Sequence, residues 1–229
     1  MDIHKPKPWH GARELLKEVG IIVIGVLIAL SADQVVQWLH VQREVSEARE
    51  ALHDEIAANG AIALFSIEED RCLAKGLDGY ARWAQGGPHA EHFRTTFQDL
   101  RSSAWEEVRS GPVTHMALKE RLQLAAYYDH VRSQLGIIAL ERNPYSTLTA
   151  ISQKPQLSAA DAERLLEVVA EARLFGAVRS GYGRGLLADA KAMHVEAHPI
   201  GEGSRQALAW ECFEPGSHSP WGEFSSPGS

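Results

Sequence analysis

Cysteine is scarce in this chain, and the cysteine pairs typical of zinc sites are missing. The 229 residues include two cysteines, Cys72 and Cys212, and no C-x-x-C pattern. Two cysteines alone cannot build a structural zinc site, so none is expected. They can form one disulfide in an oxidising compartment, or serve as two unrelated small apolar side chains. The sequence leaves both interpretations open.

An excess of basic residues is also missing. The chain has 23 Lys and Arg against 30 Asp and Glu, which gives a net charge of −7. Proteins that bind nucleic acid need a clustered basic surface, so no nucleic-acid partner is expected. Basic residues do gather before the first apolar segment, where Lys5, Lys7, Arg13 and Lys17 lie.

Runs of alternating apolar and polar residues, which indicate strands, do not occur. Apolar residues instead recur at helical spacing, which predicts helices over residues 90–109, 114–142 and 158 to about 197. Asn143-Pro144 is expected to end the second of these, and Ser158 with Asp161 forms a capping box that starts the third. Helices joined by short Gly/Pro loops predict an all-α fold, an antiparallel helical bundle over residues 40–198.

One long apolar run is present. Val19 to Ala32 is uncharged, but a helix of this length spans only about 21 Å, short of the roughly 30 Å hydrocarbon core. A transmembrane helix over residues 16–39 is long enough, with Trp9 and Trp38 near the two interfaces. The residues expected to contact lipid are Val19, Ile21, Ile22, Val23, Ile24, Val26, Leu27, Ile28 and Leu30.

Two other interpretations of this run stay open. A buried core helix would suit its length, and a cleaved signal peptide would use the marginal site Ala29-Leu30-Ser31. The run is apolar on all sides and continues without a helix breaker, which favours a retained signal anchor. Lys and Arg are more frequent before it than after it, so residues 1–15 are expected in the cytoplasm and the body in the periplasm, at a bacterial inner membrane.

An apolar stripe follows the run and has two interpretations. Trp38, Val41, Val45, Ala48 and Leu52 recur at three-four spacing, and the pattern falters at Glu55 and Asn59. The stripe is either a two-heptad coiled-coil seam or the apolar face of an amphipathic helix that packs on the chain's own domain. The residues predicted for an oligomer or partner contact are Asp33, Gln37, Trp38, Val41, Val45 and Leu52.

Motifs that carry catalysis are weak. The stretch His194-Val195-Glu196-Ala197-His198 would place two histidines on one helix face, but it is not H-E-x-x-H, and solvated residues at a helix end also explain it. Glu68, Glu69 and Asp70 are consecutive, so they are expected to point in different directions. His53, Asp54 and Glu55 are expected on a charged outward face. Residues 181–185, Gly-Tyr-Gly-Arg-Gly, are expected to form a hinge or a close helix contact.

The last segment, residues 199–229, is rich in Gly, Ser and Pro and has no period. It is expected to be a disordered tail, in which Trp210, Phe213, Trp221 and Phe224 are candidates for docking on a partner or on the bundle.

Two stretches resemble a family. Residues 9–34, WHGARELLKEVGIIVIGVLIALSADQ, are similar to the start of uncharacterised single-pass membrane-anchored proteins of proteobacteria, and residues 104–116, AWEEVRSGPVTHM, look like their central segment. The resemblance implies a membrane anchor with a helical body. It carries no known activity, and Trp105 and Glu106 are its central positions.

The sequence therefore predicts a membrane-anchored helical interaction module, a scaffold, sensor-like or accessory subunit of a membrane complex, and not an enzyme. Its expected partners are the lipid bilayer and a second copy or a membrane protein, and no cofactor is expected. The alternative is a membrane-tethered metal-dependent hydrolase that uses His194 and His198.

Overall fold

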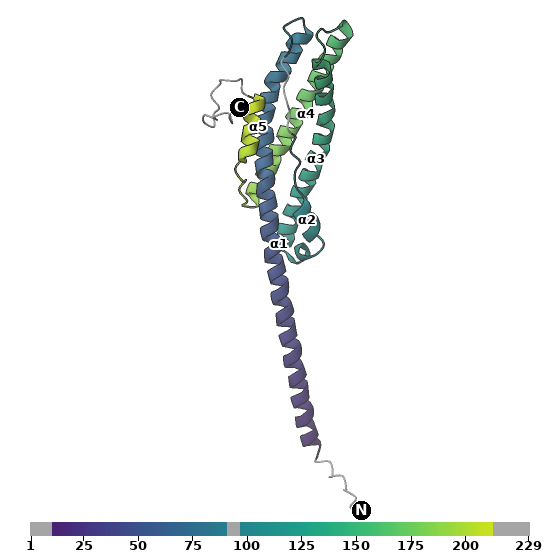
Figure 1. The fold of residues 1–229 in the computed structure, drawn as a ribbon. Helices are drawn as coiled ribbons and strands as arrows, with labels where there is room; N and C mark the ends of the chain where they lie inside the picture. The colour runs from purple at the N-terminus through teal and green to yellow at the C-terminus, as the bar shows by residue number, and fades with distance from the viewer. Residues whose placement is uncertain (1–10, 91–96, 213–229) are drawn as a thin grey trace, which may run out of the picture. The chain divides into compact units, whose positions relative to one another are not determined.

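The computed structural model describes residues 11–90 and 97–212, and within these ranges the chain is helical with no strand (Figure 1). The predicted all-α class is confirmed. The chain divides into two compact units, Met1–Glu47 and Ala48–Ser229, and the first helix has residues in both. The elements are α1 (Ala12–Ala84), α2 (Ser103–Val108), the 3₁₀ helix η1 (Pro112–His115), α3 (Leu118–Ser152), α4 (Ala159–Ala192) and α5 (Glu202–Cys212).

The first part of α1 carries an exposed apolar surface. Among the described residues one helix is long and apolar enough to cross a membrane, and its most apolar window is 0% buried. The predicted span, residues 16–39, lies within this helix. The residues expected to contact lipid are all exposed, from 47% at Val19 to 71% at Ile21.

The second unit is a bundle of α3, α4 and the part of α1 from Ala48 onward. Partners on α1 and α3 are 71 or 73 residues apart, as in Glu55 with Tyr128, so these two helices run parallel. Residues further along α1 pair with earlier residues of α4: Glu69 pairs with Arg179, and Asp78 pairs with Arg173. Helix α4 is therefore antiparallel to α1, and it also pairs antiparallel with α3.

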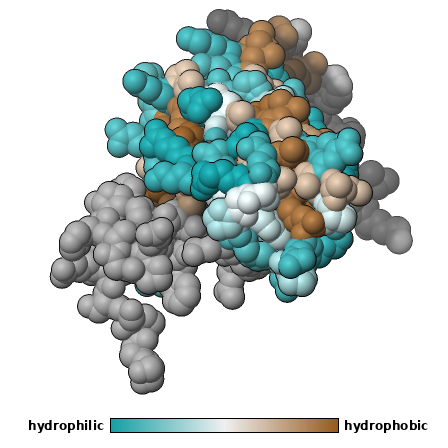
Figure 2. Space-filling view, turned by 90° about the horizontal axis from the view of Figure 1, so that it is seen from above, coloured by the Kyte–Doolittle hydropathy of each residue, from teal (hydrophilic) through white to brown (hydrophobic). Residues whose placement is uncertain are grey.

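The core of this unit lies between the three long helices. One apolar cluster joins Leu73 and Tyr80 of α1, Leu148 of α3, and Leu165 and Val168 of α4, all of them buried. The end of the bundle beyond this cluster is seen in Figure 2, where hydrophilic side chains predominate and smaller hydrophobic areas lie between them. The large apolar side chains of the cluster are buried inside the unit.

Residues 97–117, here called the return segment, lead the chain to the start of α3. The predicted helix over residues 90–109 is wrong for residues 97–102, which are not helical, and helix α2 is confined to Ser103–Val108. The side chain of Asn59 explains this, because it exchanges two hydrogen bonds, of 2.7 and 2.8 Å, with the backbone of Arg101. Tertiary contact with α1 thus overrides the helical pattern.

Helix α3 does not end at Asn143-Pro144 as predicted. It continues to Ser152 with Pro144 inside it and buried. Proline removes one hydrogen bond to the carbonyl four residues earlier, that of Leu140, whose side chain is 51% exposed. Burial of Tyr145, Leu148 and Ile151 after the proline favours continued helix and explains why the predicted end was wrong.

Helix α4 begins as predicted and ends earlier than predicted. The Ser158 hydroxyl accepts from the Asp161 N–H, and the Asp161 carboxylate accepts from the Ser158 N–H, so the capping box is confirmed. Residues 181–185 do not break the helix. Gly183 instead provides a close contact, since a Cβ there would lie 3.4 Å from the carbonyl oxygen of Ala63.

The helical part of the chain extends beyond the predicted boundary at residue 198. Residues 202–212, expected in the disordered tail, form α5, where Leu208 is buried. The Ser204 hydroxyl accepts a 2.9 Å hydrogen bond from Gln98, which ties α5 to the return segment. Phe213, Trp221 and Phe224 lie outside the described residues, as does Trp9.

Candidate functional site

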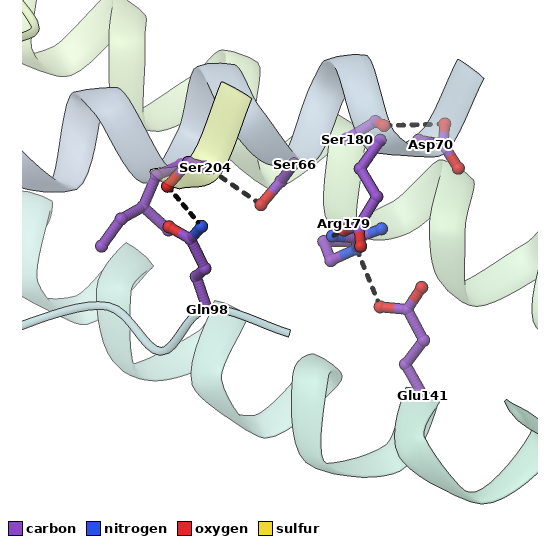
Figure 3. A network of polar contacts seen from close by, with 9 residues as sticks. Ser66, Asp70, Gln98, Glu141, Arg179, Ser180 and Ser204 are labelled. Atoms are coloured by element: carbon purple, nitrogen blue, oxygen red, sulfur yellow. Dashed lines mark hydrogen bonds and ion pairs between the residues drawn. The ribbon is translucent and has the colours of Figure 1, made fainter. Parts of the chain in front are cut away.

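A buried arginine lies where the three long helices meet. Arg179 of α4 is 1% exposed, and its Nη1 donates a 2.7 Å hydrogen bond to Glu69 of α1. One position further along each helix, Ser180 donates to Asp70 at 2.8 Å. Figure 3 shows Ser180 of α4 pointing toward Asp70, and Glu141 reaching from α3 toward Arg179. The cluster formed by Glu69, Asp70, Glu141, Arg179 and Ser180 is here called the Arg179 cluster.

Carboxylates outnumber cations in the Arg179 cluster. Glu141 is 0% exposed and lies 2.9 Å from Nε of Arg179, at ion-pair distance but without the geometry of a hydrogen bond. Its two oxygens have no hydrogen-bond partner among the described residues. Burial raises the pKa of Glu141 to about 7; Arg179 opposes this shift, and Glu69 and Asp70 add to it. Its surroundings therefore favour the protonated form of Glu141 more than water does.

The three consecutive acids have different partners: Glu68 pairs with Arg71, Glu69 with Arg179 and Asp70 with Ser180. The sequence analysis did not predict that Glu69 is buried. A signal was present, since Glu69 lies four residues before the buried Leu73 and thus on the inward face. Nothing in the sequence identified Arg179 or Glu141 as the partners.

A second polar cluster centres on Glu55, which was wrongly expected on an outward face, whereas His53 and Asp54 are exposed as predicted. Glu55 is 7% exposed, and its carboxylate accepts hydrogen bonds from the Ser103 hydroxyl and the N–H groups of Ala104 and Trp105. Glu55 thereby caps the start of α2, because the side chain of Ser102, the residue at the N-cap, makes no capping hydrogen bond. Tyr128 also donates to Glu55, at 2.8 Å.

Trp105, singled out by the resemblance, belongs to this cluster. Its ring stacks on Tyr128, with centroids 4.8 Å apart and planes 9° from parallel. Trp105 is 9% exposed, whereas Glu106 is exposed and pairs with Arg109. Glu55 and Trp105 therefore fix the segment before α3 to α1, which is a structural role.

The histidine motif does not form the predicted helical pair. Helix α4 ends at Ala192, and His194 and His198 lie in the turn and loop after it, where both are exposed together with Glu196. Within residues 11–90 and 97–212, no group of three or more His, Cys, Asp or Glu side chains is placed to hold a metal ion. The argument for a zinc pair rested on helical spacing, so it no longer applies.

The predicted partner contact divides into two parts. Leu52 is 0% exposed and Val45 is 5% exposed, so both are buried within the chain, and their part in a partner contact stays a prediction. Trp38 remains 59% exposed and Val41 is partly exposed. Asp33 accepts a 2.9 Å hydrogen bond from Gln37 on the exposed surface of α1.

The oxidation state of Cys72 is defined by the structure. Cys72, on α1 and partly buried, forms a disulfide. Cys212, the last residue of α5, is the other cysteine in the sequence. Of the two interpretations left open by the sequence, the structure favours the oxidised one for Cys72.

Comparison with known proteins does not identify a family for this chain. No protein-family model, curated protein or solved structure matches this chain.

Proposed function

We propose that the chain is a membrane-anchored helical interaction module, an accessory or sensor-like subunit of a membrane complex without its own catalytic site. The observation that carries the proposal is the exposed apolar surface of α1, whose hydropathy and length suit a bilayer. Leaving this much apolar area in water would be costly, at roughly 25 cal/mol per Å². Membership of the proteobacterial single-pass group that the sequence resembles is part of this proposal.

The topology that we propose has residues 1–15 in the cytoplasm and the bundle in the periplasm. Lys and Arg are enriched before the apolar segment, which is typical of a cytoplasmic flank. The disulfide of Cys72 supports the same orientation, because disulfides persist in the periplasm and are rare in the cytosol.

The partner surface that we propose is the exposed face of α1 around Asp33, Gln37, Trp38 and Val41. The Asp33–Gln37 hydrogen bond lowers the cost of placing these polar groups near the membrane interface. Trp38 suits the same depth, because indole rings favour the interface. A second copy of this chain is the simplest partner, since two identical faces can pair about a two-fold axis.

Alkaline carbonate extraction tests the anchor. We expect the full chain to stay in the membrane pellet, and its release into the supernatant would refute the anchor. A membrane-impermeant thiol reagent tests the orientation. After reduction of intact spheroplasts we expect the chain to be labelled from outside, and labelling only after the membrane is opened would place the bundle in the cytoplasm.

Cysteine crosslinking tests the partner surface. A Val41→Cys variant should form a disulfide-linked or partner-linked species in native membranes. Arg43→Cys is the matched control, because Arg43 is exposed and lies about 200° around the helix from residue 41. Equal crosslinking of the two variants, or none at all for Val41→Cys with only monomer on blue-native gels, would contradict the proposal.

A further inference from the structure

A cleft of about 370 Å³ lies at the opposite end of the bundle from the apolar cluster around Leu73 and Leu165. Three helices form it: α1 at Arg49 to His53, the start of α3 and the end of α4. This volume suits a small molecule. The residues that line it are Arg49, Leu52, His53, Ala117, Lys119, Glu120, Gln123, Leu124, Ala192, Met193 and His194.

The charged side chains that line the cleft are Arg49, Lys119 and Glu120, two cations and one anion. Arg49 binds Glu120 with two hydrogen bonds, of 2.7 and 3.0 Å, so these two charges compensate one another. The hydrogen bond from Arg49 is the main cause that lowers the pKa of Glu120, and His53 contributes to the shift. Lys119 adds a further cation, and the imidazoles of His53 and His194 line the same space.

Main-chain groups add to this net positive charge. Helix α3 starts at Leu118, and the residue before it, Ala117, has no side chain that could cap the first turn. Ala117, Lys119 and Glu120 at this helix start belong to the cleft lining. The first N–H groups of a helix carry partial positive charge, which favours an anion at this end; the carboxylate of Glu120 lies in the same first turn and is paired with Arg49.

His194 enters the cleft through an unusual backbone conformation. It has φ of 60° and follows Met193 at the end of α4. The His194 N–H donates to the carbonyl of Lys191, and the Val195 N–H donates to the carbonyl of Ala190. This is a Schellman motif, in which glycine usually takes the left-handed position. A histidine there places an imidazole donor in the cleft at some cost in backbone energy.

From these observations we propose that the cleft binds a phosphate-bearing anion through Lys119, His53, His194 and the first turn of α3. Lysine and imidazole N–H groups are donors, and phosphate oxygens accept charge-assisted hydrogen bonds from them. The same chemistry is offered by a free phosphate compound and by the head group of an anionic phospholipid. The proposal does not rest on the partner surface of α1.

Thermal unfolding of the full chain in phosphatidylcholine nanodiscs tests the site. Inorganic phosphate is added up to about 20 mM at constant ionic strength, so that general screening stays fixed. A second series replaces part of the phosphatidylcholine by phosphatidylglycerol without added phosphate. Lys119→Gln is the test variant, and Lys75→Gln is its control, because Lys75 is exposed on α1 and does not line the cleft.

We expect a rise in melting temperature with phosphate or with phosphatidylglycerol in the wild type and in Lys75→Gln. In Lys119→Gln the apparent affinity should fall by about tenfold, the loss typical of one charge-assisted hydrogen bond. A response to phosphate identifies a soluble ligand, and a response to phosphatidylglycerol alone identifies the lipid. No response in the wild type, or an equal response in both variants, would overturn the proposal.

Discussion

The side chain of Asn59 replaces a backbone partner for Arg101: its amide nitrogen donates to the Arg101 carbonyl and its oxygen accepts from the Arg101 N–H. Asn59 itself is 0% exposed, and it lies on α1 at a position where the apolar stripe is interrupted. At this position of α1, a polar side chain therefore binds the return segment through Arg101.

Asn59→Ala should destabilise the protein by about 1–3 kcal/mol, because two hydrogen bonds are lost and backbone groups of Arg101 lose their partner. Urea unfolding measures the change, and hydrogen exchange at the Arg101 amide should accelerate. Gln42→Ala, at an exposed position of the same helix, is the control and should change stability by less than about 0.5 kcal/mol. Unchanged exchange at Arg101 would contradict the role of Asn59.

Glu141→Gln should flatten the dependence of stability on pH. The folded-state pKa of Glu141 is raised from 4.5 to about 7, so the folded state binds a proton more tightly than the unfolded state. The contribution of Glu141 is fully present below pH 4.5 and is lost as pH rises through 7, by up to about 3 kcal/mol.

The measurement is the free energy of unfolding of the wild type and the variant between about pH 4.5 and 8, the range that brackets this shift. Glu163→Gln, which removes an exposed carboxylate of α4, is the control and should keep the slope of the wild type. If Glu141→Gln keeps that slope as well, Glu141 is ionised in the folded state throughout this range.

His194→Gly should leave the protein as stable as the wild type or stabilise it by up to about 1 kcal/mol. Glycine adopts positive φ without the steric cost that a side chain pays, although it also increases the entropy of the unfolded chain. His198→Gly is the matched control: His198 lacks positive φ, so glycine there only increases the entropy of the unfolded chain and should destabilise, while the N–H that donates to the Ala57 carbonyl at 2.9 Å is kept. Thermal unfolding compares the two, and the opposite order would contradict the Schellman motif.

Gly60→Ala should be destabilising, although alanine is the better helix former by about 1 kcal/mol. A Cβ on Gly60 would lie 2.6 Å from the Cβ of Ala197 and 2.9 Å from its Cα, so the loop after α4 would have to move. Gly181→Ala, in α4 with open space around the new methyl group, should stabilise instead. A gain in melting temperature for both variants would show that the loop does not pack against α1.

The fold class and the apolar segment were predictable because both rest on periodicity, which the sequence displays directly. The capping box at Ser158 was equally visible, because it depends on residues three apart. Pro144 misled the prediction of a helix end, since the burial that holds α3 together beyond it is a tertiary effect. The pairing of Glu69 with Arg179 spans 110 residues, and local spacing contains no information about it.

The parallel arrangement of α1 and α3 has a consequence for synthesis. The partners of α1 follow it by 71 to 73 positions on α3 and by 95 to 110 positions on α4. At roughly 5–20 residues per second, the inward face of α1 waits on the order of 5–20 seconds before α4 leaves the ribosome. Helices α3 and α4 are neighbours along the chain and can pair first, since local contacts form fastest. The face of α1 that packs on α4 is therefore exposed in the nascent chain during this interval, and exposed apolar surface favours aggregation.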